Sequence, residues 1–284
     1  MKTFKLFILL LVITFLNESA YCQEISGTQA IIKKGVLDVA MHEKDQPPFF
    51  MVDKDGTLIG VDVEIAKKIG ESLGVEVRFN RDSKTFDEVI EKVKNKEADL
   101  GISKLSFTLL RARSVLYTDP YMVLRKALLI NRLVFAKIKA TRSADTLRQL
   151  MNEKSSVIGV IDKSSYVTFA HDYFPDTTIV PMATWENDIL KSLEEGKILA
   201  AFRDESEVMK YFFLKPEANF TIMPVILKNN NDPIHMVVAP DNFHFKDWLD
   251  GFLITLHQEL TVSSILSKYE SYFEYKNENK PVNK

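Results

Sequence analysis

The chain has 284 residues, of which 46% are hydrophobic and 27% charged, a composition typical of a globular protein with one or two domains. Its formal net charge of −2 provides no basic field for nucleic acid and no polybasic patch for anionic lipid. The five histidines and the single cysteine show no metal-ligand spacing, and there is no glycine-rich phosphate loop. We therefore expect no metal or other cofactor and no nucleic-acid partner.

The N-terminus has the order of a secretory signal. Lys2 and Lys5 precede an apolar run over residues 6–16 that is too short to span a bilayer, and small residues follow it. We predict cleavage after Cys22 and export of the mature chain to the periplasm. The alternative is a lipoprotein acylated at Cys22, which the bulky Tyr21 directly before it disfavours.

Strands and helices alternate in the first part of the chain. The expected elements are strands over 36–40 and 75–79, helices over 60–74 and 86–96, and a buried strand that begins near residue 100. Between the first strand and the first helix, two prolines form a rigid loop that presents Phe49 and Phe50. This order is a doubly wound α/β pattern, in which ligands bind outside the carboxyl ends of the strands.

Residues 98–121 combine a strand end with a candidate site for a carboxylate. Beyond the apolar run, Ser106 or Thr108 can cap a short helix, and Arg111 follows. The free N–H groups of a helix start and the fork of a guanidinium both suit a carboxylate. The alternative is an ordinary strand-to-helix junction with a surface arginine.

A second α/β unit follows and is complete by about residue 231. We expect strands over 127–131, 157–161 and 199–202, with a basic connector after the first. The expected helices cover 145–151 and 188–193, and another follows residues 162–166 and runs through residue 174. Ser164 and Ser165 follow one strand end and form a second candidate anion site, and Asp204 follows another. A strand over 232–238 and amphipathic helices over 248–260 and 262–273 close the chain.

The spacing around Arg111 resembles that of a known family. Thr108 stands three residues before it, Tyr117 six residues after it, and Asp-Pro-Tyr at 119–121 closes the stretch. This is similar to the signature of the type 3 extracellular solute-binding proteins of bacterial ABC importers, and the ligand cores of ionotropic glutamate receptors are similar. The resemblance implies an α/β, two-lobe periplasmic binding protein type II fold, with the second lobe inserted in the first and a two-strand hinge.

The resemblance also implies a division of the chain. The signal peptide would cover residues 1–22, the first lobe 23–123 and 232–284, and the second lobe 124–231. The two crossings between the lobes would form a hinge that closes them on a ligand.

Carried over position by position, the resemblance implies a set of ligand contacts. Arg111 would grip the α-carboxylate of an amino acid with help from Ser106, and Asp204 would receive the α-ammonium. The other implied contacts are Ser164, Ser165, Phe86 and an aromatic ring of Phe49 or Phe50. Alternatives remain open, because Asp204 and the serines could be helix caps and the phenylalanines could belong to the core.

Two lysines depart from the family pattern. Lys163 stands where the family usually has glycine, so a turn that needs a positive φ would be strained. Lys104 stands where the family often contributes a backbone carbonyl, and its ammonium could enter the cleft or stay in solvent. Both charges hint at an acidic ligand, although solvated surface lysines are the commoner outcome.

The function that the resemblance implies is capture of an amino acid or related small zwitterion by hinge closure, and its delivery to an ABC permease of the inner membrane. We expect a monomeric binding protein and not an enzyme. One alternative is an enzyme similar to the cyclohexadienyl dehydratases, with Glu205, Asp204 or His42 as proton donor. The other is a ligand sensor for a membrane partner.

Overall fold

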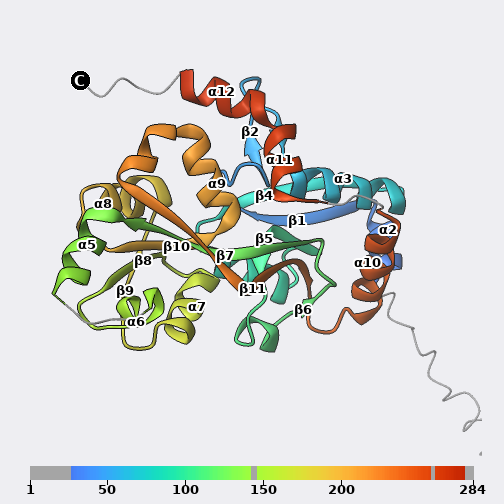
Figure 1. Ribbon diagram of the computed structural model, residues 1–284. Helices are drawn as coiled ribbons and strands as arrows, with labels where there is room; N and C mark the ends of the chain where they lie inside the picture. The colour runs from blue at the N-terminus through green and yellow to red at the C-terminus, as the bar shows by residue number, and fades with distance from the viewer. Residues whose placement is uncertain (1–26, 142–145, 257–259, 279–284) are drawn as a thin grey trace, which may run out of the picture.

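The computed structural model describes residues 27–141, 146–256 and 260–278. The expected signal peptide, including Cys22, lies outside these ranges. In the described part, two α/β lobes share one nine-stranded sheet in the order β4-β1-β5-β11-β7-β10-β8-β9, with β6 paired to β11 (Figure 1). To this sheet the first lobe contributes β1 (Val36–His42), β4 (Glu76–Ser83), β5 (Leu100–Ser106) and β6 (Leu116–Tyr117), while β2 (Met51–Val52) and β3 (Leu58–Ile59) form a separate pair. The strands of the second lobe are β8 (Val157–Ile161), β9 (Thr178–Met182) and β10 (Ala200–Asp204).

Two long strands belong to both lobes and form the hinge. They are β7 (Met122–Asn131) and β11 (Ile222–Val238), which run antiparallel through the middle of the molecule (Figure 1). Leu124 lies opposite Asp232, so the two expected crossings are neighbours on one ladder. The register of this ladder shifts between Ile226 and Asn231. The two-lobe fold with a two-strand hinge is confirmed, and the lobe boundaries at 123/124 and 231/232 stay predictions.

The helices cover the faces of the sheet. In the first lobe they are α2 (Thr28–Lys34), α3 (Val61–Leu73), α4 (Phe86–Lys94), α10 (Phe243–Thr255), α11 (Val262–Lys268) and α12 (Glu270–Glu278). In the second they are α5 (Arg132–Ala140), α6 (Leu147–Met151), α7 (Ser165–Tyr173), α8 (Lys191–Glu194) and α9 (Glu205–Leu214).

Local chemistry fixes where the helices of the first lobe begin. The Thr85 hydroxyl caps α4 by accepting from the Glu88 N–H at 3.1 Å. Gly60 precedes α3 with a φ of 128°, and a Cβ there would lie 2.2 Å from the Phe49 carbonyl oxygen. Only glycine allows this close approach, which holds the loop of Phe49 and Phe50 against the start of α3.

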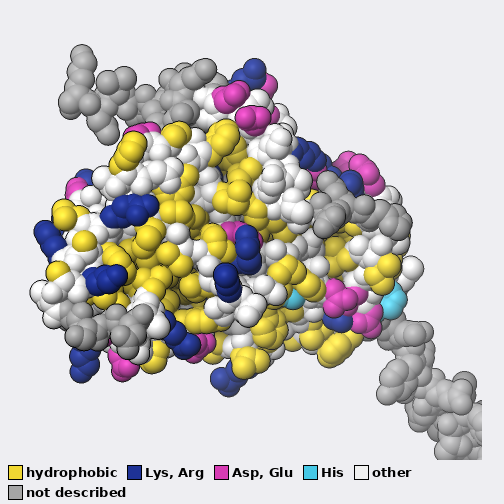
Figure 2. Space-filling model, in the orientation of Figure 1, with side chains coloured by type: hydrophobic (Ala, Val, Ile, Leu, Met, Phe, Trp, Pro, Cys, Tyr) yellow, Lys and Arg dark blue, Asp and Glu magenta, His cyan; other side chains and the backbone are white. Residues whose placement is uncertain are grey.

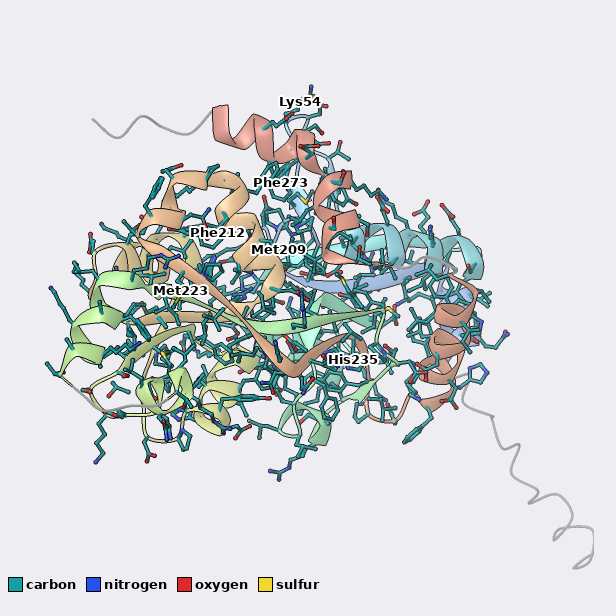
Figure 3. All side chains as sticks on the ribbon, viewed as in Figure 1. Lys54, Met209, Phe212, Met223, His235 and Phe273 are labelled. Carbon is teal, nitrogen blue, oxygen red and sulfur yellow. The ribbon has the colours of Figure 1, made fainter. Side chains whose placement is uncertain are left out.

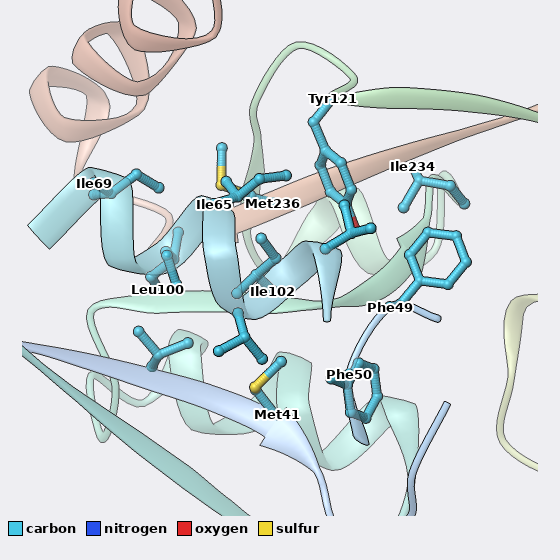
Figure 4. Close-up of a cluster of buried hydrophobic side chains, with 14 of the residues drawn as sticks. Met41, Phe49, Phe50, Ile65, Ile69, Leu100, Ile102, Tyr121, Ile234 and Met236 are labelled. Carbon is cyan, nitrogen blue, oxygen red and sulfur yellow. The ribbon is translucent and has the colours of Figure 1, made fainter. Parts of the chain in front are cut away.

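Buried apolar side chains form one large cluster in the first lobe and another in the second. The first contains Phe49 and Phe50, both fully buried, and Figure 4 shows them beside Met41 and Ile234. The second surrounds Phe202 on β10. A third cluster includes side chains from both lobes, among them Phe86 and Trp185. Apolar contact between the lobes therefore supports the conformation described here.

Several element boundaries differ from the sequence expectations. The buried strand from residue 100 does not stop when its apolar run ends but continues as β5 to Ser106. The return strand begins at Ile222 and not at residue 232, because residues 222–226 pair with β7 before the register shift and residues 231–234 pair with it again afterwards. The basic connector is helical, since Asn131 caps α5 by accepting from two backbone N–H groups. Strand β9 had no counterpart in the sequence interpretation.

The surface carries an apolar patch over α9 and the first half of β11. Figure 2 shows apolar side chains gathered there, and Figure 3 labels Met209, Phe212 and Met223 in the same region. Met209 is 42% exposed. In the part of the chain that the structure describes, the helices lack the length and apolar character needed to cross a membrane.

Candidate ligand-binding site

A small cavity lies between the lobes, where β5 and β10 end. Its walls come from Phe86, Lys104, Ser106 and Arg111 of the first lobe, from Ser164, Ser165, Tyr166, Arg203 and Asp204 of the second, and from Asp232 and Ile234 on β11. Its volume is about 20 Å³, close to the ~10–15 Å³ that a single water requires. The lobes are thus in contact here, and a larger molecule needs them to part.

Arg111 is held at the cavity by partners from both lobes. Its backbone N–H donates to the Thr108 hydroxyl at 3.2 Å, at the start of a single 3₁₀ turn and not of a full helix. Its guanidinium donates from Nε and Nη2 to Asp87 Oδ1, at 2.9 and 2.7 Å. Nη2 also lies 3.4 Å from the Lys163 carbonyl oxygen across the cleft. The Asp87 side chain is half exposed, so it can yield to a competing carboxylate.

The three serines of the predicted site line the cavity. Ser106 is the last residue of β5, and Ser165 is the first of α7. Ser164 precedes α7 without capping it by its side chain, because its hydroxyl donates to the Ile161 carbonyl at 2.7 Å. Lys163 before it has a φ of 51°, so the turn keeps the left-handed conformation that glycine would adopt without strain.

Lys104 crosses the cleft. Its Nζ lies 2.8 Å from Asp204 Oδ2 and 3.1 Å from Glu207 Oε1, and it donates to the Ser206 hydroxyl at 3.0 Å. The three protons of an ammonium thus all have acceptors on the second lobe. The ammonium also lies 4.7 Å from the centre of the Phe49 ring. Of the two outcomes left open for this side chain, burial in the cleft is the one observed.

The backbone of β5 directs Lys104 into the cleft. Its φ is 51°, and residues 102–104 lie opposite Met236 alone, because the β5–β11 register shifts there. The Lys104 N–H donates to Asp62 Oδ2 at 2.8 Å, while the Tyr121 hydroxyl donates to Asp62 Oδ1 at 2.7 Å. Burial nevertheless raises the pKa of Asp62 to about 7.

Asp204 is both a helix cap and an ion-pair partner. Its Oδ1 accepts from the backbone N–H groups of Ser206 and Glu207 at the start of α9, and from the Ser206 hydroxyl. Its Oδ2 faces Lys104 and, at 3.5 Å, the Arg203 Nε. Burial acts to raise its pKa, but the neighbouring cations outweigh that effect and the pKa is lowered. Both oxygens of this carboxylate are therefore engaged.

Arg203 is a cavity residue absent from the predicted site. Its guanidinium lies 5.9 Å from the centre of the Phe86 ring in one lobe and 5.7 Å from that of Trp185 in the other. Nη2 donates to Gln46 Oε1 at 2.9 Å, and Nη1 is buried without a hydrogen-bond partner. The sequence signal was an arginine inside an otherwise apolar buried strand, next to Asp204.

Asp232 is the second unpredicted cavity residue. It is fully buried on β11, where its Oδ2 accepts from the Tyr166 hydroxyl at 2.7 Å and its Oδ1 has no partner. Burial, and to a smaller extent the Asp204 charge, raises its pKa. The Tyr166 hydrogen bond, the Lys126 charge and the nearby Ser106 hydroxyl oppose this rise in the pKa. The sequence placed this aspartate at a crossing but gave no sign that it faces the ligand cavity.

The three predicted aromatic contacts divide into two groups. Phe86 lines the cavity beside the Arg203 guanidinium. Phe49 and Phe50 lie instead in the core of the first lobe (Figure 4), where the Phe49 ring contacts the Lys104 ammonium.

Two of the residues considered as proton donors of an enzyme, Glu205 and His42, are poorly suited to that role. The Glu205 carboxylate is bound to Arg125 at 2.5 Å on the hinge strand β7. Burial, followed by nearby cations, lowers the pKa of His42 to about 4, so it is a poor proton donor near neutral pH. Within the described ranges, His, Cys, Asp and Glu form no group of three or more that could hold a metal ion.

Comparison with known proteins identifies the family and supports the fold. The sequence profile of the bacterial extracellular solute-binding proteins, family 3, matches residues 37–272. The chain belongs to this family. The family 3 protein described here is 29% identical to an arginine-binding periplasmic protein of Mannheimia haemolytica over 175 residues, which is 61% of this chain and 65% of that relative. It is 23% identical to the ABC transporter arginine-binding protein 1 of Escherichia coli K12, over 78% of this chain and 86% of that one.

A solved structure supports the fold of this family 3 protein. The ancestral amino acid-binding protein AncCDT-1, a precursor of cyclohexadienyl dehydratase, superposes with a TM-score of 0.66 at 21% identity. The match covers 87% of this chain and 98% of that one. At this identity the similarity establishes the two-lobe architecture and leaves the ligand open.

Proposed function

We propose that this protein is an extracytoplasmic binding protein that captures an amino acid or related small zwitterion between its lobes and delivers it to an ABC-type importer. One observation carries the proposal: charged and hydroxyl side chains from both lobes converge on one cavity beside a two-strand hinge. The relatives named for arginine binding and for ABC transport support the solute class and the importer. We further propose a periplasmic, monomeric protein without catalytic activity.

The cavity suits closure around a ligand. Contacts between the lobes include Lys104 with Asp204 and Arg111 with the Lys163 carbonyl. A ligand that replaces or bridges such contacts favours the closed state by its differential affinity for it. In this proposal the carboxylate lies near Arg111, Ser106 and the Ser164–Ser165 turn. Its charge-assisted hydrogen bonds strengthen as closure removes water.

The proposal is tested by calorimetry of the exported chain with the common amino acids and their deaminated analogues. Arg111→Ala should weaken the best ligand at least ~30-fold, since loss of one partner of a desolvated charge pair costs about 2–5 kcal/mol. Arg113→Ala removes an exposed arginine two residues away and is the matched control. Absence of any binding, or equal affinity of Arg111→Ala and wild type, would reject the proposed function.

Hydrogen exchange provides an independent measurement of whether the two lobes close on the ligand. Ligand should slow the exchange of amides around Ser106 and Ser164 together, because these residues belong to different lobes. Protection of one lobe only would favour a rigid pocket over a two-lobe clamp.

The dehydratase alternative has one specific point in its favour, the structural similarity to a precursor of cyclohexadienyl dehydratase. The paired Glu205 and the low pKa of His42 argue against it. Turnover of prephenate or arogenate by the purified protein would establish it.

A further inference from the structure

The Lys104 ammonium occupies the place beside Asp204 where the family resemblance puts the ammonium of the ligand. Lys104 Nζ lies 2.8 Å from Asp204 Oδ2, and both side chains are at most 3% exposed. Asp204 Oδ1 is also occupied, by donors at the start of α9. In this conformation no lone pair of Asp204 is left for a second ammonium.

Displacing Lys104 would be unfavourable. Its three ammonium protons have acceptors, its N–H is fixed by Asp62, and its backbone holds a φ of 51°. A lysine backbone in this left-handed region is strained, and such strain persists only where the surroundings enforce it. A ligand that expelled the Lys104 side chain from Asp204 would leave a buried ammonium short of partners.

Two other charged atoms in the cavity are free. Among the described residues, the buried side-chain atoms without a hydrogen-bond partner are Ser83 Oγ, Arg203 Nη1, Asp232 Oδ1 and His235 Nε2. The two of these that carry charge, one positive and one negative, both belong to residues that line the cavity. Each of these groups has partners at its other polar atoms, but an unsatisfied atom on a buried charged group is costly, so Nη1 and Oδ1 point to a ligand with the complementary groups.

Apart from these two free atoms, the charged side chains of the cavity have opposite partners, and Arg203 itself meets Asp204 Oδ2 through its Nε at 3.5 Å. Arg111 is paired with Asp87, and Lys104 with Asp204 and Glu207. A ligand with one carboxylate and one ammonium therefore satisfies the free atoms. Its carboxylate replaces the half-exposed Asp87 on Arg111, whereas a third charge buried in the cleft would have to open the pair of Lys104 with Asp204. Phe86 and Ile234 supply apolar wall.

We propose that Asp232 receives the ligand ammonium, that Arg203 shares the ligand carboxylate with Arg111, and that Lys104 stays on Asp204 as a built-in ammonium. The ligand is accordingly an amino acid with an uncharged side chain. This assignment rests on the proposed function and specifies its substrate class. It distinguishes this protein from relatives named for arginine, a ligand with a cationic side chain.

The first test needs only wild-type protein. Calorimetry compares uncharged amino acids such as alanine, serine, leucine and phenylalanine with arginine, lysine and glutamate, and each with its deaminated acid. We expect the best ligand to be uncharged, its deaminated acid to bind at least ~30-fold more weakly, and the charged amino acids at least ~10-fold more weakly. Preference for arginine or lysine, or equal binding of a deaminated acid, would overturn the inference and leave the proposed function intact.

The second test uses variants. Asp232→Asn should reduce amino acid binding at least ~30-fold and deaminated acids less than threefold, with the exposed Asp241→Asn as matched control. Lys104→Ala frees Asp204, so it should raise the affinity for lysine or arginine at least ~10-fold. Full amino acid binding by Asp232→Asn would contradict the assignment. If this variant does not fold, the wild-type preferences above decide the matter. Binding of no panel member would instead reject the proposed function.

Discussion

Asp204 and Asp232 are two buried aspartates on the strands β10 and β11, and both line the same cavity. Asp204 has donors on both oxygens and a lowered pKa, whereas Asp232 has one free oxygen and a raised pKa. The residue type and the burial are the same, so the difference comes from the neighbours. Lys104, Arg203 and the start of α9 engage both oxygens of Asp204, so in our proposal this aspartate belongs to the scaffold and Asp232 receives the ligand. The family position of an acid therefore does not fix its role.

The largest expected effect is on stability: replacing Asp204 should lower the free energy of unfolding much more than replacing Asp232. Asp204→Asn leaves Lys104 with Glu207 as its remaining charged partner, and breaking a buried ion pair typically costs about 3–5 kcal/mol. Asp232→Asn should change the free energy of unfolding by less than about 1 kcal/mol, because Oδ1 has no hydrogen-bond partner and burial raises the pKa, so the fold gains little from the charge of this carboxylate. Urea unfolding measures both changes in free energy, and equal changes in the two variants would contradict the difference proposed between the two aspartates.

Asp62, which accepts a hydrogen bond from the Lys104 backbone N–H, should make the stability of the protein depend on pH. Burial raises the pKa of Asp62 from 3.8 to about 7, so the folded protein holds this proton more tightly than the unfolded chain does. The resulting stabilisation is complete below pH ~4 and is lost as the pH rises to ~7. Three pKa units correspond to about 4 kcal/mol at most.

The matched variant for that test is Asp62→Asn, which cannot titrate. The free energy of unfolding of wild type minus that of the variant should fall between pH 4 and 7. A difference that stays constant over this range would show that Asp62 is ionised throughout.

A double-mutant cycle would sharpen the pairing of Lys104. We expect Lys104→Met and Asp204→Asn to be coupled by about 1–3 kcal/mol, because the two groups are in direct contact. The same cycle with Asp232→Asn should give less than about 0.5 kcal/mol. Stronger coupling to Asp232 than to Asp204 would mean that Lys104 pairs with Asp232 in solution.

The smallest expected effect concerns Ser206, which accepts from Lys104 Nζ at 3.0 Å and donates to Asp204. Ser206→Ala removes one neutral member of the network and should cost roughly 1 kcal/mol in unfolding free energy. A change as large as that of Asp204→Asn would mean that the hydroxyl, and not the charge, holds Lys104 in place.

Much of the fold followed from local sequence patterns. Buried runs such as 157–161, and helix ends such as Gly74 with its φ of 69°, are encoded locally. The first half of β11 was missed because the polar stretch over 228–231 hides its continuity with residues 222–226, whose pairing with β7 forms only in the tertiary structure. The extension of β5 through Lys104 was missed for a similar reason, since pairing with β11 outweighs the break in the apolar run.

The candidate site was predicted where short motifs place residues at strand ends. Arg111, Ser106, Ser164, Ser165, Asp204, Phe86 and Lys104 all line the cavity. Asp232 could not be found in this way, because its place beside the cavity depends on its register against Leu124. The pairing of Lys104 with Asp204 spans 100 residues and depends on how the lobes meet, which no local pattern contains.

The position of Trp185 gives the cleft an optical reporter. Its ring lies 5.7 Å from the Arg203 guanidinium, whereas the chain's other tryptophan, Trp248, stacks on Phe245 and Phe252 in α10. A ligand that draws the Arg203 guanidinium toward its carboxylate changes the electric field at one indole and leaves the other as an internal standard. The protein should therefore signal occupancy by a shift in intrinsic fluorescence, and Trp185→Phe should silence it.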